Sequence, residues 1–207
     1  MRVLNKGCRG KDVETLQKIL NLYVDGIFGS LTEEAVKEFQ KQHGLYPDGI
    51  VGEKTWKILL PSDNPYDIVK SKRKITEIIV HCTATREGRP TTIAEITSWH
   101  KQRGFSTIGY HYVVMIDGTV CKGRDVNVSG AHCVGHNSNS IGVCYVGGLD
   151  KRNGEEKDTR TSAQKFSMLN LLKKLKALYP NAKIYGHCDF SNKKCPCFDA
   201  KNEYRNI

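Results

Sequence analysis

A histidine and three cysteines lie close together near the C-terminal end of the chain, in the stretch HCDFSNKKCPCFD at residues 187–199. Imidazole nitrogens and thiolates are ligands that zinc prefers. A second histidine, His81, follows the apolar run IIV, just as His187 follows IYG. These two histidines and Cys195 supply three ligands and leave a fourth position for water, which is typical of a catalytic zinc site.

Two other interpretations of the same stretch stay open at this point. A structural zinc knuckle normally uses a C-x-x-C pair, whereas a single residue separates Cys195 from Cys197. A disulfide framework requires an oxidising compartment. The eight cysteines are spread from residue 8 to residue 197 of a chain long enough to bury a core, which favours reduced thiols.

The 207-residue chain has a net charge of +10, and nearly all of the excess lies beyond residue 60. Such a charge indicates an anionic partner, namely nucleic acid, an acidic membrane or an acidic cell wall. Because no run interleaves arginine with aromatic residues, we expect no specific nucleic-acid partner. No segment approaches the ~20 apolar residues of a membrane span. The N-terminus lacks the apolar core of a signal peptide, so we expect synthesis in the cytoplasm without one.

The first sixty residues contain an internal repeat. LYVDGIFG at 22–29 recurs as LYPDGIVG at 45–52, and in each copy an Asp-Gly turn leads into a helix. After the first copy, Ser30-x-x-Glu33 predicts a capping box, and Gly44 predicts the end of that helix. With a preceding amphipathic helix, the pattern predicts a small all-α, three-helix domain over residues 1–60. The polar, proline-containing segment 61–74 is typical of a linker.

From residue 75 onward, strand and helix patterns alternate. Apolar runs at 75–81, 141–148 and 183–187 predict strands, and Asp117-Gly118 predicts a hairpin. Two helices are predicted, one after a capping box at Thr92-x-x-Glu95 and a longer amphipathic one in the segment 162–180. Because a hairpin interrupts the alternation, we expect an α/β domain over 75–207 with a mixed β-sheet flanked by helices.

Both parts of the chain resemble known families. The stretch GKDVETLQKILN together with DGIFGSLTEEAVKEFQKQHGLYPDGIVGEKTWKIL resembles the three-helix peptidoglycan-binding domain of wall hydrolases. Residues 75–200 resemble the zinc-dependent type-2 N-acetylmuramoyl-L-alanine amidases, which include phage lysozymes and share their fold with peptidoglycan-recognition proteins. The second resemblance rests on IIVHCTAT, WHKQRGF, IGYHYVVMIDGTVCKGRD, HNSNSIGVCYVGG and KKCPCFD, in that order.

The amidase resemblance implies a role for each matching residue. It implies that one zinc ion per chain is bound by His81, His187 and Cys195. It further implies that Tyr110 positions the attacking water or the substrate carbonyl, and that Lys193 stabilises the developing oxyanion. The positions that would contact the muramyl peptide are His132 and Asn137.

The chain departs from the family at Cys197, where the family has a small residue such as Ser or Gly. A second thiol there could compete for the metal or oxidise with Cys195. Cys82 and Cys188, which each follow a zinc-binding histidine, are expected to point away from the metal if their segments are strand-like.

The expected function is hydrolysis of the amide between the lactyl group of N-acetylmuramic acid and L-alanine of the peptidoglycan stem peptide. The alternative is a muramyl-peptide recognition protein without catalysis. An enzyme of this kind without a signal peptide fits a phage or prophage endolysin, which acts on the cell wall after release, or a protein exported by a non-classical route.

Overall fold

The computed structural model describes residues 2–59 and 68–207, and these form two compact units that we describe separately. Residues 60–67, which make up much of the expected linker, lie outside the described residues. The rest of that segment packs on the C-terminal unit. Ile68 belongs to its hydrophobic core, and Arg73 donates to the backbone carbonyls of Val126 and Ser140.

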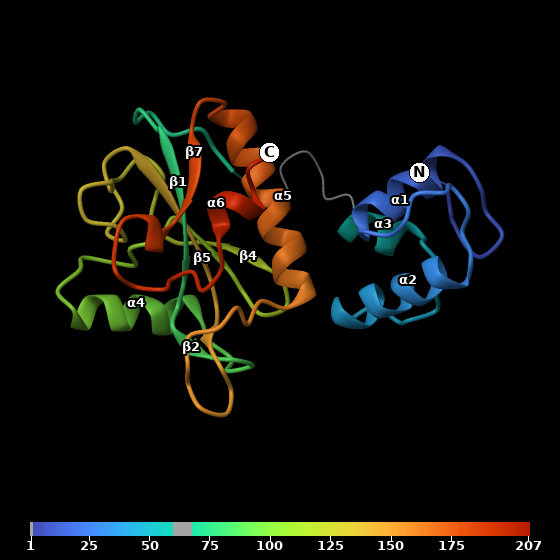
Figure 1. The fold of residues 1–207 in the computed structure, drawn as a ribbon, viewed down its shortest axis with the longest axis horizontal. Coiled ribbons are helices and arrows are strands. Elements are labelled where there is room, and N and C mark those ends of the chain that lie inside the picture. Colours follow the sequence, from blue (N-terminus) through green and yellow to red (C-terminus); the bar gives the residue numbers. More distant parts are fainter. Residues whose placement is uncertain (1, 60–67) are drawn as a thin grey trace. The chain divides into compact units, whose positions relative to one another are not determined.

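The N-terminal unit contains the three expected helices, α1 (Lys11–Ile19), α2 (Ser30–Gln42) and α3 (Glu53–Leu59) (Figure 1). Their apolar faces meet in one core, made by Leu4, Val13, Leu16, Phe28, Val36, Phe39, Val51, Trp56 and Leu59. Gly44 has a φ of 66° just beyond α2, as expected of the residue that ends a helix.

The capping box expected at Ser30 and Glu33 is wrong. Ser30 is already the first helical residue, Gly29 precedes the helix, and no side chain caps it. The Glu33 carboxylate instead lies 2.7 Å from the Lys37 ammonium and 3.4 Å from that of Lys6. Glu33 therefore pairs with two lysines rather than turning back to the start of its own helix.

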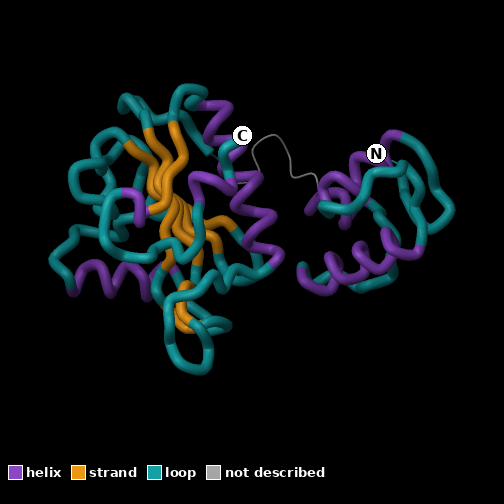
Figure 2. The backbone as a smooth tube through the Cα atoms, viewed as in Figure 1, coloured by secondary structure: helices purple, strands orange, loops and turns teal. Residues whose placement is uncertain are grey.

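The C-terminal unit is built on a five-stranded mixed sheet in the order β4-β3-β5-β1-β7, which confirms the expected fold class (Figure 2). Its strands are β1 (Glu77–Cys82), β3 (Tyr112–Val114), β4 (Val120–Lys122), β5 (Ser140–Tyr145) and β7 (Lys183–Gly186). β1 runs parallel to both β5 and β7, and β3 runs parallel to β5. The antiparallel pair β3–β4 is the hairpin predicted at Asp117-Gly118.

Helices cover both faces of this sheet. The long helix α5 (Ser162–Leu178) packs on one face through Met168, Leu171, Leu172 and Leu175. Helix α4 (Ile93–Gln102) packs on the other, where Ile96 meets Val113 and Cys144. Because side chains alternate along a strand, Val80 and Cys82 point to the α5 face and His81 points to the α4 face.

Capping boxes begin both of these helices. Thr92 and Glu95 form the predicted box at α4, and Thr161 with Gln164 forms one at α5 that the sequence analysis did not identify. Also unforeseen were the two-stranded sheet of β2 (Thr85–Arg86) and β6 (Gly148–Leu149) and the short helix α6 (Ala200–Glu203). Among the described residues, no helix is both long and apolar enough to cross a membrane.

Candidate active site and metal centre

His81 and His187 come together because their strands are parallel neighbours. In the register of β1 and β7, Val80 pairs with Gly186, so the next residue of each strand is a histidine at the same edge of the sheet. His187 begins a short 3-10 turn, and the Asp189 carboxylate accepts a 2.8 Å hydrogen bond from the Gly186 amide that closes this turn. The two imidazole centroids lie 4.7 Å apart.

Cys195 reaches the histidines from the loop that follows β7. The amide of Cys188 donates to the Cys195 carbonyl at 2.7 Å, and the Tyr145 hydroxyl donates to the Pro196 carbonyl at 2.8 Å. A Cβ on Gly186 would lie 2.8 Å from Pro196 Cδ, so this close approach of loop and strand requires glycine. The loop is thereby fixed to both β5 and β7.

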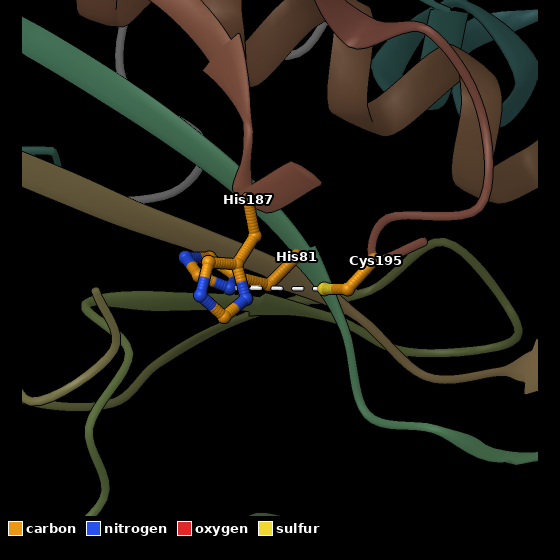
Figure 3. A group of neighbouring side chains, drawn as sticks. All are labelled: His81, His187 and Cys195. Atoms are coloured by element: carbon orange, nitrogen blue, oxygen red, sulfur yellow. Dashed lines mark hydrogen bonds between the residues drawn. The ribbon is translucent and has the colours of Figure 1, made fainter. Parts of the chain in front are cut away.

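The three side chains converge on one point (Figure 3). The possible ligand atoms of His81, His187 and Cys195 all lie within 4.8 Å of one another. Between these side chains, the structure resolves a polar contact of 3.8 Å that joins His81 Nδ1 and Cys195 Sγ. In addition, the Cys82 amide donates to Cys195 Sγ at 3.3 Å.

Burial keeps both histidines neutral. It holds the pKa of His81 well below its ordinary value, and it lowers the pKa of His187 in the same direction. A neutral imidazole has a free lone pair on one nitrogen, which is the form that binds a metal. The cluster therefore offers two neutral nitrogens and a sulfur at neutral pH.

The cluster lies in a pocket with a volume of about 410 Å³. Tyr110 and Lys193 both line it, as the sequence analysis expected of groups near the reacting bond. Burial raises the pKa of Tyr110 well above its usual range, so its hydroxyl stays protonated at neutral pH. Lys193 is exposed and contributes a positive charge at the rim.

Several further residues of the pocket were not assigned a role from the sequence, among them His100, Arg103, Phe105 and Glu156. The first three belong to the motif WHKQRGF, whose position across the end of a capped helix was the available signal. The His100 ring lies 5.1 Å from that of Tyr110, and His100 Nδ1 accepts from the Gly109 amide. Glu156 supplies the one carboxylate among the described residues that line the pocket.

His132 and Asn137 also line the pocket, but much of their polar surface is engaged within the protein. The Asn137 carboxamide oxygen accepts from the amides of His132 and Cys133 at 2.8 and 3.0 Å. His132 Nδ1 lies 3.0 Å from His81 Nε2, and His132 Nε2 lies 3.4 Å from Ser140 Oγ. Of the Asn137 carboxamide, Nδ2 remains as the group able to donate to a ligand.

The described cysteines are free thiols. Cys82 faces the α5 side of the sheet, away from His81, and Cys188 is exposed. Cys197 Sγ lies 3.8 Å from Cys82 Sγ and 3.3 Å from the Gly148 carbonyl oxygen. The nearest thiol contact of Cys197 that the structure resolves is therefore with Cys82 and not with Cys195.

Comparison with known proteins gives the family of each unit. The sequence profile of the N-acetylmuramoyl-L-alanine amidases matches residues 71–198, and that of a peptidoglycan binding domain matches residues 9–59. The chain belongs to the N-acetylmuramoyl-L-alanine amidase family. The amidase is 41% identical over 130 residues to the endolysin of Klebsiella phage KP32, across 63% of this chain and 85% of the relative.

Two solved structures resemble the same unit of the amidase. The N-acetylmuramoyl-L-alanine amidase LysC from Clostridium intestinale URNW is 29% identical with a TM-score of 0.55, covering 67% of this chain and 87% of that one. The complex of the recognition proteins PGRP-LCa and PGRP-LCx with tracheal cytotoxin is 26% identical with a TM-score of 0.53, covering 67% and 86%. The amidase is thus a hydrolase of peptidoglycan, which is the polymer it binds.

Proposed function

We propose that the amidase is a zinc enzyme of the endolysin type, in which His81, His187 and Cys195 hold one zinc ion. The observation that carries the proposal is the convergence of these three ligand atoms within 4.8 Å, inside the pocket of an amidase. Its reaction is hydrolysis of the amide between the lactyl group of N-acetylmuramic acid and L-alanine of the stem peptide.

The donor set fits zinc in both chemistry and spacing. Tetrahedral zinc with Zn–N near ~2.0 Å and Zn–S near ~2.3 Å holds its nitrogen and sulfur ligands roughly 3.6 Å apart. The 3.8 Å between His81 Nδ1 and Cys195 Sγ is close to this separation. Three protein ligands from one open pocket leave a coordination position facing the substrate, as catalytic zinc sites require.

A zinc ion bound there supplies Lewis acidity toward the scissile carbonyl and acidifies a water molecule to a pKa near ~7. Lys193 would place its charge beside the oxygen of the carbonyl as negative charge develops on it. Tyr110, which stays protonated, would orient the water or the carbonyl by hydrogen bonding. Asn137 Nδ2 would bind the muramyl peptide at the wall of the pocket.

The leaving nitrogen of alanine requires a proton before it departs. Within the pocket, the Glu156 carboxylate could take a proton from the attacking water and pass it to this nitrogen, in addition to a relay near Tyr110. Glu156 is exposed on the segment that follows β6, where it forms an antiparallel bridge with Leu149. We assign it as a candidate acid for this step.

The domain boundaries belong to the same proposal. Residues 1–60 would tether the chain to its polymeric substrate, residues 61–74 would connect the two units, and residues 75–207 would carry the chemistry. Tethering raises the local substrate concentration without any new contact at the active site. The phage endolysin relative supports a role in lysis, in which the enzyme reaches the wall after release from the cytoplasm.

The test is digestion of purified peptidoglycan with the full chain, scoring new alanine amino termini and new reducing sugar ends. The zinc amidase releases amino termini without reducing ends, loses this activity to a zinc chelator and regains it on addition of zinc. Binding to the wall with neither product would instead identify a recognition protein, as in the structural relatives that bind tracheal cytotoxin. Release of amino termini that persists in the presence of the chelator would contradict the proposed zinc dependence.

A further inference from the structure

His81 uses both of its ring nitrogens. Nδ1 faces Cys195 Sγ at 3.8 Å, and Nε2 faces His132 Nδ1 at 3.0 Å (Figure 3 shows the first of these contacts). A hydrogen bond to the second nitrogen of a metal-binding histidine sets its tautomer and its orientation. His132, on the loop before β5, is therefore placed to control how His81 presents its lone pair.

The hydrogen bonds around His132 determine which nitrogen carries the proton. The Ser140 hydroxyl donates its hydrogen to the His136 carbonyl at 2.6 Å, so Ser140 Oγ can only accept from His132. His132 Nε2, at 3.4 Å from this oxygen, must then carry the proton. In the neutral ring this leaves Nδ1 as an acceptor.

The same logic extends to His81. Because His132 Nδ1 is an acceptor, His81 Nε2 must be the donor across the 3.0 Å contact. The lone pair of His81 is then on Nδ1, the atom that faces Cys195. The chain from the His136 carbonyl through Ser140 and His132 thus leaves His81 in the one neutral tautomer that can bind a metal at the cluster.

The ring of His132 sits in a slot formed by two glycines. A Cβ on Gly130 would lie 2.4 Å from His132 Cδ2, and a Cβ on Gly142 would lie 2.6 Å from the same atom. The backbone amide of His132 is held at 2.8 Å by Asn137 Oδ1. Any other residue at either glycine would displace the ring, so the fold reserves this space for an imidazole in one orientation.

We propose that His132 is a positioning residue for the metal centre, which fixes the tautomer and orientation of His81 through Nδ1. The inference rests on the proposed zinc site and deepens it. It also reassigns His132, which the amidase resemblance placed at the muramyl peptide. Both ring nitrogens of His132 are engaged inside the protein, so its contribution passes through His81 and reaches the substrate only by way of the metal.

The experiment compares His132→Asn with His132→Leu in the full chain, because the two side chains have the same branched shape. Asn retains an acceptor close to the position of Nδ1, and Leu has none. Zinc affinity is measured by competition with a chromophoric chelator. Loss of an outer-shell partner typically weakens metal binding ~10–100-fold, so we expect that loss in the Leu variant and less than about threefold loss in the Asn variant.

The visible spectrum of the cobalt-substituted protein gives a second readout, since it reports ligand geometry directly. We expect an altered spectrum for the Leu variant and a native one for Asn. His136→Asn, on the same loop but outside the chain of ring contacts, is the matched control for zinc affinity. If the Leu variant does not fold, Ser140→Ala removes the hydroxyl that accepts from Nε2, and we expect it to weaken zinc binding a few-fold.

The outcomes separate this inference from the proposed function. Native zinc affinity in the Leu variant, with a raised KM for peptidoglycan fragments at saturating zinc, would overturn the positioning role and return His132 to the substrate. Equal losses in the Asn and Leu variants would also overturn it, because shape rather than the acceptor would then matter. Failure of the native chain to bind zinc would overturn the proposed function itself, and with it this inference.

Discussion

The two units of the amidase organise their buried polar groups in opposite ways. In the N-terminal unit, Gln17 Nε2 donates to Asp25 at 2.7 Å and to the Ile27 carbonyl at 3.0 Å. At the equivalent position before the second copy of the repeat, Gln40 Nε2 donates to Asp48 at 2.8 Å and to the Ile50 carbonyl at 2.9 Å. Each set of hydrogen bonds joins one glutamine to the Asp-Gly turn that follows it, and the chain contains two such sets.

The active site has no such repetition. The contact of His81 with His132 spans 51 residues, and its contact with Cys195 spans 114. The helical unit is therefore specified by local pairs that tolerate duplication, whereas the site is assembled from distant segments, each of which is needed once. We therefore expect equivalent substitutions in the two Gln networks to have similar effects. The active site has no second copy that could compensate for a substitution.

The largest effect is expected for Cys195→Ser. In the proposed zinc site this substitution removes the sulfur ligand, so amide hydrolysis should fall by more than the ~10²–10³-fold that a single electrostatic contact carries. Wall binding by residues 1–60 should not change, because the two units do not share this site. Amine release and pull-down on purified walls measure the two quantities. Loss of both hydrolysis and wall binding in this variant would contradict the assignment of these two activities to separate units.

Lys193→Ala should lower kcat by ~10²–10³ because it removes the positive charge that we propose lies beside the developing oxyanion. Zinc content should stay native, since Lys193 is no ligand. The matched control is Lys194→Ala, the next residue along the loop, which lines a neighbouring surface depression and not the pocket of the cluster. A rise in KM of similar size in both lysine variants, with kcat unchanged, would point to general attraction of the wall instead.

Gln17→Met tests the hydrogen-bond network of the N-terminal unit. It leaves the Asp25 carboxylate and the Gly26 amide without their partner, which costs about 1–3 kcal/mol of unfolding free energy in the N-terminal unit. Gln40→Met should cost a similar amount, and Gln42→Met, at a half-buried position whose side chain bonds only Glu38 among the resolved contacts, should cost little. Denaturant unfolding followed by the fluorescence of Trp56, in a Trp99→Phe background, measures each. Unequal costs for Gln17 and Gln40 would show that the repeats are not equivalent.

The smallest effect concerns pH and the interior of the C-terminal unit. Burial lowers the pKa of His111 to about 4, and its Nδ1 accepts from the Gly142 amide. As pH falls from 7 toward 4, the unfolded chain gains a proton at His111 that the folded chain does not accept, so stability decreases with decreasing pH. The loss between pH 7 and 5.5 is roughly 1 kcal/mol from this group.

His111→Asn keeps an acceptor for the Gly142 amide but does not titrate, so its stability should depend less on pH in this window. Urea unfolding of the zinc-free protein at both pH values measures the difference and separates it from loss of metal. An unchanged pH dependence in the variant would assign the effect to other groups.

The sequence predicted the features that depend on local patterns. The hairpin at Asp117-Gly118, the capping box at Thr92 and the three helices of the first unit follow from spacing within a few residues. The Ser30 box failed because the Glu33 carboxylate pairs with Lys37, its i+4 neighbour, and with Lys6 from outside the helix, and the capping pattern does not show the second partner. Local patterns carry no information on partners that come from elsewhere in the chain.

The candidate site was predictable only in part for the same reason. Two apolar runs that each end in histidine suggest a shared sheet edge, but their pairing as neighbours follows from the strand order. The placement of Cys195, His132 and Glu156 depends on loops whose paths no periodicity describes. The glycine slot around His132 likewise becomes visible only when Gly130 and Gly142 are both seen against the same ring.

The most direct test of the central claim is a titration of the metal-free full chain with zinc, following amine release from peptidoglycan. The account predicts that activity rises in proportion to added zinc and reaches its plateau at one zinc per chain, and that His187→Ala stays inactive throughout. Full activity in the metal-free chain, or a native titration curve for His187→Ala, would contradict it.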